Sequence, residues 1–184
     1  MPRQHAVYDH ATVTLHWLMA TLVLVLWLIG TFLEDIVPKG VLRSGIWSAH
    51  FVLGFLFTGV IVALLAWRHT RGRQLPVEDP GPLHVLAKAT HAALYLLLLL
   101  IAGLGIANAF VRGVTLVGPL ALPQLGDPDW RRPLTHWHGL AANILMAVAL
   151  FHAAAALIHH YLWHDGVLRR ILPARASSDP AGRH

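Results

Sequence analysis

The sequence predicts an all-α protein in which four helices form an up-and-down bundle across a membrane. Hydrophobic residues make up 56% of the chain and charged residues 12%, whereas about 25% of the residues in a typical soluble domain are charged. Four long apolar stretches contain no Asp, Glu, Lys or Arg, and polar connections separate them. With 184 residues, the chain suits one transmembrane domain without a separate soluble catalytic domain.

Each apolar stretch is long enough to be a membrane-spanning helix. An α-helix needs roughly 20 apolar residues to cross about 30 Å of hydrocarbon. The first stretch is too long for the core of a signal peptide, and no small-residue cleavage site follows it, so we expect it to remain as a helix. Trp17, near its start, suits the aromatic belt at a membrane interface. The expected helices cover residues 11–33, 44–67, 89–111 and 133–163.

Helix-breaking residues mark the connections between the stretches. Pro38 and Gly40 lie between the first two stretches, and residues 68–88 contain three prolines. Because Pro and Gly interrupt helices, neither connection can belong to a span. After the last stretch, residues 165–184 form a basic tail that we expect to be cytoplasmic and disordered at its end.

The basic residues predict how the bundle is oriented. Four spans place both termini on one side of the membrane, and nine of the 14 Lys and Arg residues flank that side. Cytoplasmic loops of membrane proteins carry an excess of Lys and Arg, so we expect both termini in the cytoplasm. The net charge of +5 then reflects cations that flank the membrane, and we expect no nucleic-acid partner.

The fourth stretch, residues 133–163, carries the strongest functional signal. Hydrocarbon cannot satisfy the polar nitrogens of imidazole, so histidines inside a membrane are functional candidates. His138 and His152 are fourteen residues apart, which separates them by about 21 Å along a helix and by about 40° around it. They therefore project from one stripe at two depths. The histidines of this stretch are His136, His138, His152, His159 and His160.

Histidines on two other stretches lie at matching depths. His16 is near the start of the first span, at the cytoplasmic side, and His50 is near the start of the second span, at the periplasmic side. His50 with His138 would form an outer site, and His16 with His152 an inner site. Four-helix bundles build cofactor sites from side chains on facing helices in this way.

A b-type haem with two axial imidazoles explains each pair better than a bare metal ion. Zinc and copper sites normally have three or four protein ligands, and each depth offers two obvious ones. The chain has no cysteine, which excludes cysteine-ligated iron–sulfur clusters and covalent c-type attachment. The sequence therefore predicts two non-covalent b-type haems and a route for single electrons across the membrane.

Neighbouring histidines leave alternatives open for these ligands. His91, on the third stretch, competes with His16 for the inner iron. His136 competes with His138, but it lies about 160° from His152 around the helix. We therefore interpret His136 as an interfacial or substrate-side residue.

The remaining histidines of the fourth stretch lie at the cytoplasmic interface. His159 is seven residues past His152 on the same stripe. It is too shallow for a buried haem and better placed for a quinone headgroup, a proton relay or a haem propionate. We expect His160 and His164 to be solvated interface residues.

The residues around these histidines resemble a known family. The segment HAAAALIHHYLWHDGVLRRILP, which begins at His152, resembles the bacterial cytochrome b561 family, as do Trp137-His138 and Thr14-Leu15-His16-Trp17. The resemblance covers essentially the whole chain. It implies a four-helix inner-membrane protein with two b haems, held by the same four histidines: His16, His50, His138 and His152.

The resemblance also implies a reaction. Proteins similar to this one are linked to ubiquinone on the inner side, and some look like superoxide oxidases that take an electron from superoxide at the periplasmic face. On this reading the chain is an oxidoreductase in which His159, helped by His91 or Arg68, contacts quinone or a haem propionate.

Four membrane helices could also serve two other functions, of which the sequence disfavours the second. The chain could be a haem-bearing membrane anchor that carries electrons for a partner dehydrogenase or hydrogenase, with residues 112–132 as the docking loop. A metal-ion transporter would need carboxylates along its path through the membrane, and none of the four stretches has one.

Overall fold

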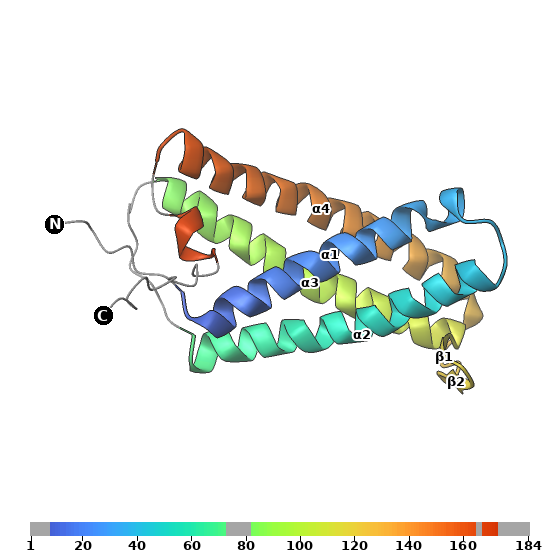
Figure 1. The fold of residues 1–184 in the computed structure, drawn as a ribbon. Coiled ribbons are helices and arrows are strands. Elements are labelled where there is room, and N and C mark those ends of the chain that lie inside the picture. Colours follow the sequence, from blue (N-terminus) through green and yellow to red (C-terminus); the bar gives the residue numbers. More distant parts are fainter. Residues whose placement is uncertain (1–7, 73–81, 165–166, 173–184) are drawn as a thin grey trace, which may run out of the picture.

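The computed structural model describes residues 8–72, 82–164 and 167–172, and it confirms the predicted fold class. Four helices, each long and apolar enough to cross a membrane, run up and down side by side (Figure 1). The disorder expected at the end of the basic tail falls on residues 173–184, outside the described residues. The helices are α1 (His10–Ile36), α2 (Val41–Thr70), α3 (Pro82–Arg112) and α4 (Arg131–Tyr161).

Most helix ends extend beyond the apolar stretches that predict them. Asp9 caps the start of α1, where its Oδ1 accepts a hydrogen bond of 2.9 Å from the Thr12 amide. The Trp67 indole of α2 donates to the same carboxylate at 2.9 Å. At the other end of α1, Arg43 of α2 donates to the Val37 carbonyl at 2.6 Å. Polar side chains thus satisfy helix ends and join α1 to α2 on both sides of the bundle.

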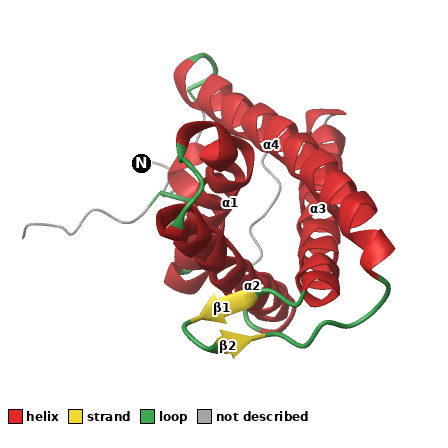
Figure 2. Ribbon diagram, turned by 90° about the vertical axis from the view of Figure 1, so that its right-hand side faces the viewer, coloured by secondary structure: helices red, strands yellow, loops and turns green. Residues whose placement is uncertain are grey.

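The connection between α3 and α4 contains short elements that the sequence analysis did not predict. Two strands, β1 (Thr115–Val117) and β2 (Leu120–Ala121), form an antiparallel hairpin, and the short 3₁₀ helix η1 (Pro128–Trp130) precedes α4. Figure 2 shows the hairpin at the end of the bundle, beside α2. Ser48 of α2 donates to the Thr115 carbonyl at 3.2 Å, so the hairpin is tied to the bundle.

A glycine makes the turn from α3 into this hairpin. The Val114 amide donates back to the Ala109 carbonyl at 3.3 Å, across Gly113 with a φ of +62°. This pattern closes a helix through a left-handed residue, which glycine adopts without a steric penalty. The turn ends α3 at the level where the hairpin begins.

The apolar core lies in the middle of the bundle and draws on all four helices. On α4 it comprises Ala141 and Leu145, which fall between His138 and His152. Among the described residues, no polar or charged side chain is fully buried. Packed apolar side chains therefore lie between the two levels of the bundle at which the histidines gather. The other core residues are Met19, Leu22, Phe57, Val60, Ile61, Leu98, Ile101 and Ala102.

A short segment after α4 packs against the end of the bundle that lies opposite the hairpin. It contains the 3₁₀ helix η2 (Leu168–Arg170). The Trp17 indole of α1 donates to the Ile171 carbonyl at 2.9 Å, and the Tyr8 amide donates to the Arg170 carbonyl at 3.1 Å. The start of α1 and the end of α4 thus lie at the same end of the bundle, as an even number of spans requires. Which side of the membrane this end faces stays a prediction.

Candidate haem-binding sites

The outer pair of histidines meets across the bundle. The rings of His50 on α2 and His138 on α4 have centroids 6.4 Å apart and planes inclined at 78°. Metal–imidazole bonds are about 2.0–2.1 Å long, and a five-membered ring with bonds of about 1.33 Å has a radius of about 1.1 Å. A metal ion between two imidazoles would thus hold their centroids about 6.3 Å apart. The separation of the two rings therefore matches that of two imidazoles bound to one metal ion.

Glycines on the other two helices lie against this pair. A Cβ atom built on Gly105 of α3 would stand 3.2 Å from Cε1 of His138, which is closer than ordinary van der Waals contact. A Cβ atom on Gly30 of α1 would stand 3.5 Å from Cε1 of His50, which is ordinary contact. All four helices therefore shape the outer site, and α3 approaches His138 most closely because residue 105 has no side chain.

Several ring nitrogens at both levels have no hydrogen bond to the part of the chain that the structure describes. The Nδ1 atoms of His16, His50 and His138 are buried without a hydrogen bond from the described residues. The backbone of Ile101 lies within hydrogen-bonding reach of the His138 ring. Buried polar atoms are normally hydrogen-bonded, so each exception requires an explanation. A ligand that is bound by the rings would account for imidazoles placed inside an apolar bundle.

The inner level gathers three histidines rather than two. His91 of α3 and His152 of α4 are in direct ring contact, with centroids 5.1 Å apart and planes at 66°. His16 of α1 lies close enough to His152 and to His91 to interact with both electrostatically. The 5.1 Å separation is shorter than two imidazoles on one metal require, so His91 and His152 as they lie here do not fit one iron.

Arg68 and Tyr95 adjoin the inner histidines. Arg68 of α2 donates from Nη1 to the Tyr95 hydroxyl at 3.1 Å, and its guanidinium carbon lies 5.6 Å from the centroid of the Tyr95 ring. Arg68 also interacts electrostatically with His91. Tyr95 is not among the functional residues predicted from the sequence. Its position one turn after His91 could have identified it, because residues four apart share a helix face.

The remaining predicted histidines lie near the ends of α4. His136 is exposed and contacts Trp137, and His159 packs edge-on against Trp163 with centroids 4.4 Å apart. His164 is exposed, as expected. His160 differs from the expectation of a solvated residue, because it is half-buried and its Nδ1 atom is enclosed without a partner among the described residues.

A polar cluster joins α3 and α4 at the outer end. Arg112 donates from Nε to the Asn108 side-chain oxygen at 3.0 Å and from Nη2 to the Thr135 hydroxyl at 2.8 Å. The Thr135 hydroxyl lies 3.3 Å from the same Asn108 oxygen. The sequence analysis did not single out these three residues as a cluster, because the loop and part of α4 separate Thr135 from the other two in the chain.

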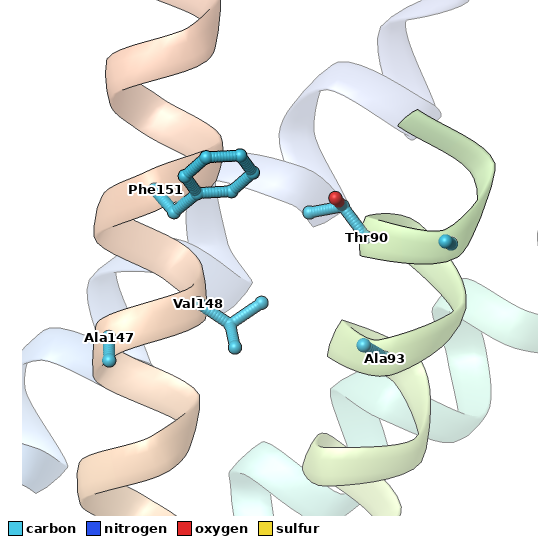
Figure 3. Close-up of a pocket in the computed structure, with 6 residues that line it drawn as sticks. Thr90, Ala93, Ala147, Val148 and Phe151 are labelled. Atoms are coloured by element: carbon cyan, nitrogen blue, oxygen red, sulfur yellow. The ribbon is translucent and has the colours of Figure 1, made fainter. Parts of the chain in front are cut away.

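An apolar hollow of about 440 Å³ lies between α3 and α4 on the inner half of the bundle. Figure 3 shows Val148 and Phe151 of α4 facing Thr90 and Ala93 of α3. Thr90 and Phe151 directly precede His91 and His152 in the chain, so the hollow lies at the level of the inner histidines. A second hollow of about 420 Å³ lies along the start of α1, between His10 and Thr21.

The described residues contain no group of three or more His, Cys, Asp or Glu side chains arranged to hold a metal ion. The pair formed by His50 and His138 instead suits a cofactor that provides the other ligands of its own metal ion. A porphyrin does so, with four nitrogens in a plane.

Comparison with known proteins agrees with this chemistry. Residues 7–174 match the model of the family described as prokaryotic cytochrome b561. The chain is 30% identical over 179 residues to Probable superoxide oxidase CybB of Yersinia pestis, covering 93% of this chain and 98% of the relative. It is also 30% identical over 176 residues to cytochrome b562 of Cereibacter sphaeroides, covering 94% and 99%. Cytochrome b561 homolog 2 of Escherichia coli is 27% identical over 180 residues, which cover 94% of each chain.

Proposed function

Because this chain belongs to the prokaryotic cytochrome b561 family, we propose that it is a two-haem cytochrome that carries electrons from a periplasmic donor to ubiquinone. The family is one of multi-pass bacterial membrane proteins that transfer electrons and bind b-type haem. The observation that carries the proposal is the 6.4 Å separation of the His50 and His138 rings. In our proposal these two residues hold the outer iron, and His16 and His152 hold the inner iron.

The residues of this chain would bind the two haems, set the distance between them and keep water away from the space between them. Each haem supplies a centre that can gain or lose one electron. His138 and His152 project from α4 at depths about 21 Å apart, so a single rigid helix spaces both sites. Core residues such as Leu145 fill the space between the two levels and exclude water from it. Close approach of α3 at Gly105 orients the His138 ring.

The proposed donor is superoxide, and the name of the Yersinia pestis relative supports this choice. Each superoxide ion would give up one electron and leave as dioxygen. Two such electrons, with two protons, would convert one ubiquinone to ubiquinol. On this scheme the protein is a superoxide:ubiquinone oxidoreductase of the inner membrane.

The inner half of the bundle offers features suited to a quinone. The hollow between α3 and α4 is lined almost entirely by apolar side chains, as an isoprenoid tail requires, and it lies at the level of Thr90 and Phe151. His91, Arg68 and His159 offer hydrogen-bonding groups for a headgroup or a haem propionate on this side. We propose that quinone is reduced at this end.

One observation favours a second function, that of an electron-transfer anchor for a partner protein. The hairpin region at the outer end exposes large apolar side chains, since Val117, Leu120 and Leu125 are 64%, 60% and 55% accessible. A partner dehydrogenase or hydrogenase could dock on these residues. The isolated chain would then hold haem without oxidising superoxide.

The experiment is a reduced-minus-oxidised spectrum of the purified protein, with haem counted per chain and superoxide as the sole reductant. We expect two b haems that are reduced within the mixing time and are reoxidised when ubiquinone is added. The His50→Ala variant should hold one haem and lose the reaction with superoxide. Two haems that superoxide does not reduce would favour the anchor function, and absence of haem would contradict both functions.

A further inference from the structure

The Asn108–Arg112–Thr135 cluster lies directly outward of the proposed outer haem site. Asn108 is three residues beyond Gly105, where an added Cβ atom would stand 3.2 Å from the His138 ring. Thr135 is three residues before His138, on the outer side of it. Residues three apart share a helix face, so both positions continue the line of the site toward the outer surface. Arg112 lies about 10 Å along α3 from Gly105.

The two hydrogen bonds fix the guanidinium of Arg112 in one orientation. Asn108 accepts from Nε and Thr135 accepts from Nη2, and the two partners come from different helices. These bonds leave the edge formed by Nη1 and the second hydrogen of Nη2 available. That edge has the fork geometry with which arginine binds a carboxylate through two parallel hydrogen bonds.

Among residues 8–72, 82–164 and 167–172, no acidic side chain is paired with Arg112. Within the described part of the chain, its side-chain partners are the neutral groups of Asn108 and Thr135. Because both partners are neutral, the positive charge of the guanidinium can still attract an anion. The proposed haem beside it would bring two carboxylates.

We propose that Arg112, oriented by Asn108 and Thr135, binds a propionate carboxylate of the haem held by His50 and His138 and raises the reduction potential of that haem. The inference rests on the proposed function, because it needs a haem at the outer site. A guanidinium paired with the propionate offsets negative charge that otherwise stabilises the oxidised iron. Arg112 is thus a positioning residue for the haem, and the potential is its direct readout.

The test is a redox titration of the purified holoprotein and of Arg112→Gln, with haem counted per chain. We expect Arg112→Gln to keep the inner haem and to lower the midpoint potential of the outer haem, or to release that haem alone. Thr135→Val should lower the same potential by a smaller amount, because the guanidinium keeps its charge and loses one of its two orienting bonds. Unchanged potentials in both variants would overturn the proposal.

Arg132→Gln is the matched control. Arg132 is an exposed arginine at the start of α4, at the same end of the bundle, so its loss removes the same charge from the outer surface. We expect the potentials to stay as in the parent protein. Equal shifts in Arg112→Gln and Arg132→Gln would show a diffuse surface field, which contradicts a propionate contact.

A second measurement distinguishes a haem propionate from a free anion as the ligand of Arg112. If Arg112 served only to attract superoxide, Arg112→Gln would slow reduction by superoxide and leave both potentials unchanged, and the proposal would be wrong. The titration repeated in the His50→Ala background assigns the shifted signal, because the remaining haem should not respond to Arg112→Gln. A preparation without any haem would contradict the proposed function itself, whereas unshifted potentials in a two-haem protein contradict only this inference.

Discussion

At the scale of single residues, the histidines show how a membrane protein holds polar groups in an apolar interior. Each imidazole at the two levels is only partly surrounded by protein, and several ring nitrogens have no partner among the described residues. Such nitrogens would destabilise a closed apolar core by about 1–3 kcal/mol each. In the proposed function, coordination to iron would remove this cost for the one ring nitrogen that binds the metal. His50 with His138 has the required separation, whereas the inner level offers three rings for two axial positions.

The inner ligands can be identified by replacing each candidate in turn. We expect His16→Ala and His152→Ala each to reduce the haem content from two per chain to one, because one of two axial bonds is lost. His91→Ala should retain both haems. Haem counting by pyridine haemochrome spectra, with the potential of the remaining haem, makes the measurement. Loss of the inner haem from His91→Ala but not from His16→Ala would assign the iron to His91.

At the scale of elements, the helices act as rigid supports whose contacts depend on small residues. α3 approaches α4 closely at Gly105, and a Cβ atom there would stand 3.2 Å from the His138 ring. α1 is joined to α4 by a hydrogen bond of 2.9 Å from the Trp27 indole to Asn143, between the two histidine levels. Such contacts set the distance between helices, and with it the space for a flat cofactor.

Gly105→Ala therefore tests the contact between α3 and the outer site. The added methyl group must displace the His138 ring, and overpacking of this kind costs about 1–3 kcal/mol. We expect weaker retention of the outer haem, measured as haem per chain after detergent washing, and a lower thermal midpoint of the holoprotein.

Gly103→Ala is the control on the same helix. A Cβ atom at residue 103 would meet nothing within 4 Å, and Ala favours a helix over Gly by about 1 kcal/mol. We expect full haem content and a thermal midpoint that is unchanged or raised. Equal haem loss in both variants would show that the effect does not arise from contact with His138.

At the scale of the whole molecule, the up-and-down order of the helices separates two chemical environments. The outer end carries the hairpin and the Arg112 cluster, and the inner end carries Arg68, His159 and the segment with η2. An electron that passes between the two levels crosses the apolar core. The direction of the reaction across the membrane therefore depends on which end faces the periplasm.

The orientation can be measured because the chain has no cysteine. Val117→Cys places a thiol on the exposed hairpin, and Arg169→Cys places one on η2. In intact spheroplasts, a membrane-impermeant maleimide should label the first variant and leave the second unlabelled until lysis. The reverse result would put the hairpin in the cytoplasm and exchange the proposed donor and acceptor sides.

The sequence alone was sufficient for the fold class, the family and the position of each histidine along its helix. The uncharged stretches are long enough to span a membrane, and a rise of about 1.5 Å per residue converts spacing into depth. His138 and His152 are separated along α4 whatever the other helices do. Local geometry within one helix is a property of its own residues.

Only the tertiary structure decided which side chains meet across helices. The ring contact of His91 with His152, the bond from Arg68 to Tyr95, and the joining of Arg112 to Thr135 all depend on how α2, α3 and α4 rotate and pack against one another. The hairpin after α3 likewise forms where its backbone can reach α2. Spacing along a chain determines depth within a helix, but contacts between helices depend on the packing of every side chain in the core.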